Sequence, residues 1–199
     1  LTDSEGSLVI VKDESLSAEA YRLNIEKNRI KIEAGDIQGV NHGLASLLQL
    51  IMTAKDAQLP VLTIQDKPAF GYRGLMLDCA RHFWTVDELK ETLDHMAFFK
   101  LNTLHMHLTD NQAWRLSMDK YPDLVKEGTY YYDFPELSGK YYSKEDLKEI
   151  VTYAGTRGIE IIPEVDLPGH SIALLAALPE LSCRGGKFEA TPEERDWNK

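Results

Sequence analysis

Three apolar segments, separated by helix-like stretches, each end at a carboxylate, and this pattern most constrains what the chain can fold into. The segments are 72–77, 103–108 and 159–163, and the carboxylates that follow them are Asp78, Asp110 and Glu164. The stretches between them begin at Thr85 and Ser143, and each has an acidic residue three positions later, as the N-terminus of a helix often does. Strands and helices that alternate in this way build a parallel sheet. The sequence therefore predicts an α/β fold from about residue 69 onward.

The ends of these strands are also the expected position of a functional site, because parallel α/β proteins place their chemistry at the carboxyl ends of strands. One terminal carboxylate can simply cap the next helix, but three in succession, near Arg81, His107 and His170, favour a site. A nucleotide-binding sheet normally has a glycine-rich loop after its first strand. Residues 78–82 read DCARH instead, so we expect a barrel.

Residues 1–68 have a different pattern, which predicts a small α+β domain. Segments 21–25 and 29–33 alternate polar and apolar residues around a short polar turn, as a hairpin with one buried face does. A helix is expected after residues 41–43, because four apolar residues follow at helical spacing: Leu44, Leu47, Leu48 and Ile51. A polar stretch that contains a proline, 66–70, separates the two patterns. We therefore expect one domain at 1–68 and a second at 69–199.

The charge and hydropathy of the chain argue against several classes of partner. The chain contains 22 Lys and Arg against 32 Asp and Glu, a formal net charge of -10, and an acidic surface repels phosphate backbones and anionic lipids. No run of about 18 apolar residues is present, so no transmembrane helix is predicted. We therefore expect neither nucleic acid nor a membrane as a partner.

The two cysteines, Cys79 and Cys183, are too few for a disulfide scaffold. Cys79 lies in an apolar run and is expected to be buried.

Three longer phrases carry a resemblance to a known family. They are YRGLMLDCARHF at 72–83, KLNTLHMHLTDNQ at 100–112 and IPEVDLPGH at 162–170. In this order they resemble the beginning of the catalytic barrel of the β-N-acetylhexosaminidases, glycoside hydrolase family 20. The resemblance implies an N-terminal α+β accessory domain, shortened at its front, followed by the first three βα units of a TIM (β/α)8 barrel. The implied activity is removal of terminal N-acetylglucosamine or N-acetylgalactosamine from a glycan, without a cofactor.

The resemblance also implies roles for individual residues. Arg81 matches the arginine that holds the ring hydroxyls of the terminal sugar, a task that suits the planar fork of guanidinium donors. Asp110 and His170 match a pair that supports the general acid, since a carboxylate that holds a histidine fixes its tautomer and raises its basicity. Glu164 and Asp166 are expected to support the same network.

His105 and His107 leave an alternative function open. Two histidines at i and i+2 of a strand point the same way, which is a metal-ligand pattern in barrel hydrolases. The segment TDNQ at 109–112 argues against this alternative, because it matches the sugar-hydrolase pattern, in which no metal is used. We therefore predict no metal, treat His107 as a secondary member of the site, and expect His105 to be a core histidine.

One part of the family's machinery is missing from the sequence. Hydrolysis in the family needs an Asp-Glu pair after Gly-Gly on a later strand: the Glu protonates the leaving oxygen, and the Asp orients the 2-acetamido group that attacks the anomeric carbon. Here Gly185-Gly186 is followed by Lys187-Phe188. A closed barrel needs eight βα units and typically ~250 residues. We therefore expect the front part of a larger enzyme, inactive until the rest of the barrel completes the site.

A non-catalytic sugar-binding remnant is the remaining alternative, because Arg81 is present and the acid is not. The first residue is Leu1, so either a leader has been removed or the sequence starts internally. Together with the resemblance, this predicts an extracytoplasmic location: periplasmic, secreted or lysosomal.

Overall fold

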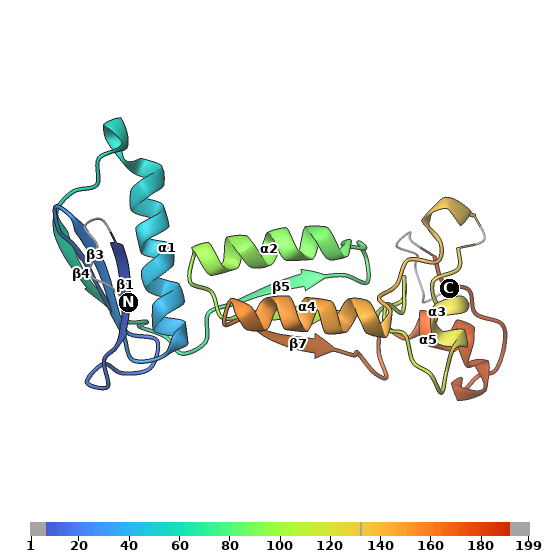
Figure 1. Cartoon of the computed structure of the whole chain (residues 1–199). Helices are drawn as coiled ribbons and strands as arrows, with labels where there is room; N and C mark the ends of the chain where they lie inside the picture. The colour runs from blue at the N-terminus through green and yellow to red at the C-terminus, as the bar shows by residue number, and fades with distance from the viewer. Residues whose placement is uncertain (1–6, 132, 192–199) are drawn as a thin grey trace. The chain divides into compact units, whose positions relative to one another are not determined.

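The computed structural model describes residues 7–131 and 133–191 and is a mixed α/β protein, as predicted (Figure 1). The chain divides into two compact units. The first unit consists of Leu1–Gly74, Glu91–Thr103 and Ala154–Glu160. The second consists of Leu75–Lys90, Leu104–Tyr153 and Ile161–Lys199.

A four-stranded sheet forms much of the first unit, in the order β1-β3-β2-β4. The strands are β1 (Ser7–Lys12), β2 (Tyr21–Ile25), β3 (Arg29–Ala34) and β4 (Leu62–Asp66). The predicted hairpin is confirmed, because β2 and β3 pair in antiparallel register. Alternate side chains of β2, those of Tyr21, Leu23 and Ile25, are buried, so this strand has one core face.

Helix α1 (Ile37–Thr53) lies along this sheet (Figure 1) and begins earlier than expected. The Asp36 side chain accepts a hydrogen bond from the Gly39 amide at 2.8 Å and so provides the N-cap. Residues 41–43, expected to precede the helix, lie inside it. Gly39 approaches the sheet closely, because a Cβ atom there would lie 2.3 Å from the Ala20 carbonyl oxygen. This close approach explains why a glycine lies in the first turn of α1, which the hydrophobic pattern alone did not indicate.

The apolar face predicted for α1 is only partly correct. Leu47 is buried, but Leu44, Leu48 and Ile51 are exposed. The face that meets the sheet is made largely of small residues, Gly39, Gly43 and Ser46, which contact residues of β2 and β3 or the residue just before β2. A contact through small residues brings the helix backbone close to the sheet, and the larger leucines then lie beside this contact rather than in it.

A second sheet has the order β5-β6-β7 and consists of β5 (Gly74–Asp78), β6 (Thr103–His107) and β7 (Glu160–Glu164). The Asn102 amide donates to the Arg73 carbonyl before β5 and β6 begin, and the Cys79 amide donates to the His107 carbonyl where they end. Neighbouring starts and neighbouring ends mean that the two strands are parallel. Hydrogen bonds from Glu160 to Asn102 and from Leu108 to Glu164 give β7 the same direction.

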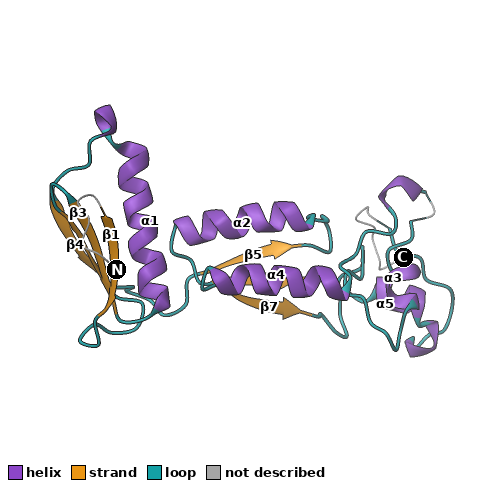
Figure 2. Cartoon of the chain, viewed as in Figure 1, coloured by secondary structure: helices purple, strands orange, loops and turns teal. Residues whose placement is uncertain are grey.

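Two long helices accompany these strands, α2 (Val86–Phe98) and α4 (Lys144–Thr156), and they lie side by side (Figure 2). An ion pair between Lys90 and Glu149 joins them. Both predicted N-terminal caps are confirmed. The Thr85 amide donates to the Glu88 carboxylate at 2.7 Å, and the Ser143 amide donates to the Asp146 carboxylate at 2.8 Å.

The inner faces of these two helices are apolar. Leu89, Leu93 and Met96 of α2 and Ile150 of α4 are buried, whereas Val151 of α4 is exposed. The short elements are α3 (Asp123–Lys126), α5 (Ile172–Ala177), η1 (Lys55–Ala57), η2 (Pro135–Leu137) and η3 (Pro179–Leu181). Within the described residues, no helix has the length and apolar character needed to cross a membrane.

Candidate functional site

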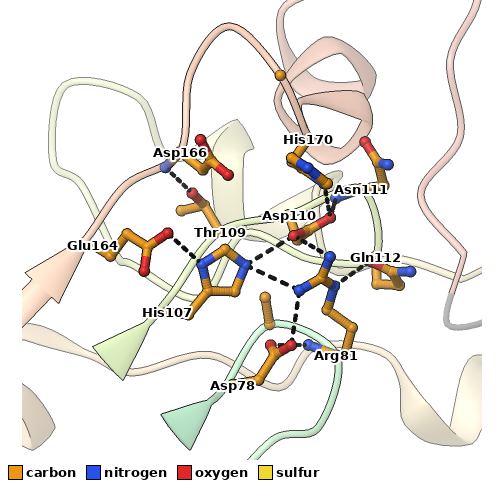
Figure 3. A network of polar contacts seen from close by, with 12 residues as sticks. Asp78, Arg81, His107, Thr109, Asp110, Asn111, Gln112, Glu164, Asp166 and His170 are labelled. Carbon is orange, nitrogen blue, oxygen red and sulfur yellow. Dashed lines mark hydrogen bonds and ion pairs between the residues drawn. The ribbon is translucent and has the colours of Figure 1, made fainter. Parts of the chain in front are cut away.

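The carboxyl ends of β5, β6 and β7 bring the candidate residues together, because each strand ends with one of them: Asp78, His107 and Glu164. Arg81 follows β5, and Asp110 follows β6. Figure 3 shows these side chains joined in one network of polar contacts. The candidate side chains therefore lie close together at the strand ends, as the sequence predicted.

Arg81 contacts four side chains, one of which is His107, whose Nε2 lies 3.3 Å from Arg81 Nη1. Its Nη2 lies 2.6 Å from Asp110 Oδ2 and its Nη1 lies 2.8 Å from Asp78 Oδ2. Its Nε donates to Gln112 Oε1 at 3.2 Å. The side chain remains 40% exposed, so the guanidinium is oriented from one side and accessible from another.

The roles of Asp78 and Gln112 in orienting Arg81 were missed at the level of sequence. Asp78 was identified as a strand-end carboxylate, but not as a partner of Arg81. The Asp78 side chain also accepts from the Arg81 amide at 2.9 Å, so it fixes both ends of the same residue. Gln112 belongs to the phrase that carried the resemblance, and this was the only sequence signal for it.

Asp110 is the centre of the network, and its side chain is 1% exposed. Its Oδ2 accepts from Arg81 and from His107 Nε2, the latter at 2.8 Å. Its Oδ1 lies 3.1 Å from His170 Nδ1 and accepts from the Asn111 amide at 2.6 Å. A carboxylate buried this deeply needs such partners, because an unpaired buried charge is costly. The two residues expected to pair, Asp110 and His170, are therefore brought together.

His170 reaches Asp110 from a backbone conformation that is uncommon for a residue with a side chain. Its φ is 53°, in the left-handed region. The side chain is half exposed, at 51%. An exposed imidazole that is held at Nδ1 presents Nε2 on the opposite side of its ring, where a further group can meet it.

His107 lies between two carboxylates and is buried. Its Nδ1 and Nε2 lie 2.8 Å from Glu164 Oε1 and from Asp110 Oδ2. Burial by itself lowers the pKa of this histidine, but the hydrogen bonds to Asp110 and Glu164 outweigh burial and raise the pKa above its ordinary value. Burial also acts to raise the pKa of Glu164, and the contact with His107 outweighs it, so that the pKa of Glu164 is lowered. The pair thus favours an ionised His107 and an ionised Glu164.

His105 is not the core histidine that the sequence predicted. One third of its side chain is exposed, at 33%, and its Nε2 lies 2.5 Å from Glu164 Oε2. The physical reason is the alternation of the strand, which places His105 and His107 on the same face. Glu164 therefore meets both histidines, one with each carboxylate oxygen.

Asp166 contributes to the site mainly through its backbone. Its amide donates to Thr109 Oγ1 at 2.9 Å, which joins the segment after β7 to the segment after β6. Its carboxylate oxygen lies within 4.8 Å of ligand atoms on His107 and Glu164, and also on Asp110 and His170.

These two groups of side chains have the spacing of metal ligands, but their charges do not suit a resident cation. The Arg81 guanidinium already neutralises Asp110. Both ring nitrogens of His107 are hydrogen-bonded to carboxylates, so neither nitrogen is free as a ligand in this arrangement. The arrangement is suited to binding hydroxyl groups and to holding protons.

Comparison with known families agrees with this geometry and with the resemblance. Residues 70–199 match the model "Glycosyl hydrolase family 20, catalytic domain", and residues 2–67 match "Glycosyl hydrolase family 20, domain 2". Both matches are to domains of one glycosyl hydrolase family. The chain belongs to glycosyl hydrolase family 20, so the predicted family is confirmed.

Curated relatives match most of this chain. A β-hexosaminidase of Vibrio furnissii is 39% identical over 184 residues, which are 87% of this chain and 30% of that protein. A β-hexosaminidase of Akkermansia muciniphila is 42% identical over 176 residues, 85% of this chain and 35% of that protein. The chain therefore spans about a third of the length of these relatives.

Solved structures with a similar fold include enzymes of the same family. The exo-β-N-acetylglucosaminidase of Vibrio harveyi, in complex with N-acetylglucosamine, has a TM-score of 0.81 and 35% identity; the match covers 92% of this chain and 33% of that one. The β-N-acetylhexosaminidase of Streptomyces coelicolor A3(2) has a TM-score of 0.83 and 35% identity, with 96% and 40% covered.

Proposed function

We propose that the protein that carries this chain is an exo-acting β-N-acetylhexosaminidase, which removes terminal N-acetylglucosamine or N-acetylgalactosamine from glycans. Support comes from the family and from relatives named β-hexosaminidase. In this proposal β5, β6 and β7 are the first three strands of a (β/α)8 barrel, and residues 1–68 are the accessory domain. An extracytoplasmic location is also part of the proposal.

One observation carries the proposal: Arg81 is fixed in place and still has donors to offer. A guanidinium has five N–H groups. Contacts with Gln112, Asp78 and Asp110 use one each on Nε, Nη1 and Nη2. The second N–H of Nη1 meets His107 Nε2 at 3.3 Å, and that of Nη2 has no described partner. A planar fork with an accessible face matches two neighbouring hydroxyls of a sugar ring, one at the unpaired Nη2 donor and one in place of the long contact with His107. We infer that Arg81 binds the non-reducing sugar in this way.

Asp110 and His170 have a different role in the proposal. Asp110 holds His170 at Nδ1, and the far ring nitrogen then faces the position where a later strand supplies the general acid. The contact with Asp110 fixes the orientation of the His170 ring, so that its other nitrogen can form a hydrogen bond with that acid and influence its proton affinity. The acid protonates the leaving oxygen, and the substrate's own acetamido group attacks the anomeric carbon with retention of configuration. The Asp-Glu pair that performs these steps is proposed to lie beyond residue 199.

The test uses the complete gene product and two aryl glycosides. We expect release of 4-nitrophenol from 4-nitrophenyl N-acetyl-β-glucosaminide and almost none from the β-glucoside, which lacks the acetamido nucleophile. A chelator should leave the rate unchanged; loss of activity with recovery on addition of zinc would support the metal-dependent alternative instead. Binding of N-acetylglucosamine without turnover would support the sugar-binding remnant.

A further inference from the structure

A buried arginine lies directly beneath the loop that carries Arg81. Arg115 is 4% exposed, and its guanidinium donates to three backbone carbonyls and lies close to the phenol of the buried Tyr131. Its Nε donates to Cys79 at 3.0 Å, its Nη2 to Ala80 at 3.0 Å and its Nη1 to Lys140 at 2.6 Å. None of the ion pairs among the described residues includes Arg115. Burial lowers the pKa of this guanidinium, as expected for a desolvated cation.

The contacts of Arg115 lie on both sides of Arg81 in the chain. Cys79 and Ala80 are the two residues before Arg81, and their carbonyls accept from the guanidinium. Phe83 is two residues after Arg81, and its ring centre lies 5.5 Å from the Arg115 Cζ, which is a cation–π contact. Arg81 therefore lies within a segment, residues 79–83, that contacts Arg115 on both sides of Arg81.

Tyr142 completes this support. Its amide donates to the Arg115 carbonyl at 2.8 Å, and its ring stacks on Phe83 with centres 4.9 Å apart. Its hydroxyl donates to the Trp84 carbonyl at 2.6 Å. Burial raises the pKa of this phenol, so the hydroxyl keeps its proton as a donor. Arg115 and Tyr142 together contact residues on both sides of Arg81.

The opposite side of the same loop is held by β6. The amides of Cys79 and Ala80 both donate to the His107 carbonyl, at 3.0 and 3.1 Å. The Cys79 carbonyl shares its peptide plane with the Ala80 amide, and the Ala80 carbonyl shares its plane with the Arg81 amide, which donates to Asp78 Oδ1. Each of these two peptide planes is therefore held at its N–H and at its carbonyl. Without Arg115 the N–H contacts remain, but the two carbonyls lose their described partner, so each plane is held at one end.

We propose that Arg115 is a positioning residue, which fixes the backbone of residues 79–84 so that the Arg81 fork meets two sugar hydroxyls. This inference rests on the proposed function. A buried cation without a carboxylate partner is costly, and an apolar side chain would fill the same space without that cost. The cation is the group that can bond two adjacent carbonyls at once and so determine the direction in which Arg81 leaves the loop.

The first experiment is a double-mutant cycle in the complete protein, with Arg115→Met and Arg115→Lys each combined with Arg81→Ala. When Arg81 is present, either change should lower kcat/KM by roughly 10- to 100-fold, the usual effect of misplacing a binding group by about 1 Å. In the Arg81→Ala background, the same change should lower kcat/KM by less than about twofold, because Arg115 acts on the reaction only by positioning Arg81. Equal losses in both backgrounds would mean that Arg115 only stabilises the fold.

Arg73 provides the matched control. Its guanidinium also donates to two backbone carbonyls, those of Lys100 and Phe70, and it pairs with Glu19, all within the first unit. Arg73→Met should lower the melting temperature and change kcat/KM by the same small factor with and without Arg81. If Arg73→Met showed the same dependence on Arg81 as Arg115→Met, the effect would not be specific to the loop.

A second measurement does not depend on activity. In a crystal structure of the complete Arg115→Met protein, the Arg81–Asp110 contact should be lost, with a separation beyond about 4 Å, the limit for an ion pair. An unchanged Arg81 would overturn the positioning role even if the enzyme were active. A displaced Arg81 in a protein without hydrolase activity would support the positioning role and overturn only the proposed function. If Arg115→Met does not fold, Tyr142→Phe, which removes the hydroxyl that contacts the Trp84 carbonyl and the Cys79 thiol, serves in both experiments.

Discussion

Arg81 Nη2 lies 2.6 Å from Oδ2 of the buried Asp110, and the other carboxylate oxygen of Asp110 meets His170. One carboxylate therefore joins the residue proposed to bind the sugar to the residue proposed to support the acid. Because both contacts depend on the same charge, substitutions on either side are expected to affect the other. The predictions below follow from this coupling and from the groups around it.

Substitution of Arg81 should weaken binding of the ground state and of the transition state together. Hydrogen bonds to a charged donor contribute about 1.5–3 kcal/mol each, so Arg81→Ala should lower kcat/KM by about tenfold or more for each bond lost. Arg81→Lys should restore little, because an ammonium group lacks the planar fork. Steady-state kinetics with an aryl N-acetylglucosaminide checks this, and near-normal cleavage by Arg81→Ala would remove Arg81 from the site.

Substitution of Asp110 or His170 should change the pH dependence of the rate. Asp110→Asn removes the charge that holds His170, and His170→Ala removes the group next to the acid, so both should displace a limb of the pH profile of kcat/KM. Asp119→Asn is the control, because Asp119 is exposed and pairs with Lys144. A pH optimum that stays in place while KM rises would reassign Asp110 and His170 to substrate contact.

The pair of His107 and Glu164 should make stability depend on pH in a defined window. The raised pKa of His107 gives stability that is fully present below the unfolded value of 6.5 and is lost as pH rises through the folded pKa. The lowered pKa of Glu164 gives stability that is fully present above 4.5 and is lost as pH falls through the folded pKa. Both contributions are therefore complete between 4.5 and 6.5.

Urea unfolding of the complete protein at a series of pH values tests this window. His107→Asn should flatten the decline in the free energy of unfolding above pH 6.5, whereas substitution of the exposed His95 by Asn should leave it unchanged. A decline that persists in His107→Asn would assign the pH dependence to another group.

Residues 1–199 on their own should not hydrolyse β-N-acetylhexosaminides. Arg81 can bind part of a sugar, but without a positioned acid a contribution of about 10²–10⁴ to the rate is missing. Without a residue that orients the acetamido group, most of the proximity advantage of the internal nucleophile is also lost. Comparable turnover by residues 1–199 and by the complete protein, with a chromogenic substrate, would mean that the acid lies among the residues already described.

The sequence by itself predicted those features that depend on local chemistry. Alternating apolar residues defined the hairpin of β2 and β3, because one face of that sheet is buried. Hydroxyl and acidic residues three positions apart defined the starts of α2 and α4, because they bond the free amides of a first turn. The run of apolar residues around Cys79 predicted its burial, and this is confirmed. Each of these needs only residues near one another in the chain.

Tertiary structure decided the rest. The small residues on the sheet-facing side of α1 depended on how closely Gly39 approaches Ala20, and the environment of His105 depended on Glu164 of another strand. Arg115 shows the reason most clearly. It meets the carbonyl of Cys79, which is 36 positions earlier in the chain, only because β5 and β6 are neighbours. Backbone carbonyls are the same in every residue, so no side-chain pattern could indicate which of them a buried guanidinium would bind.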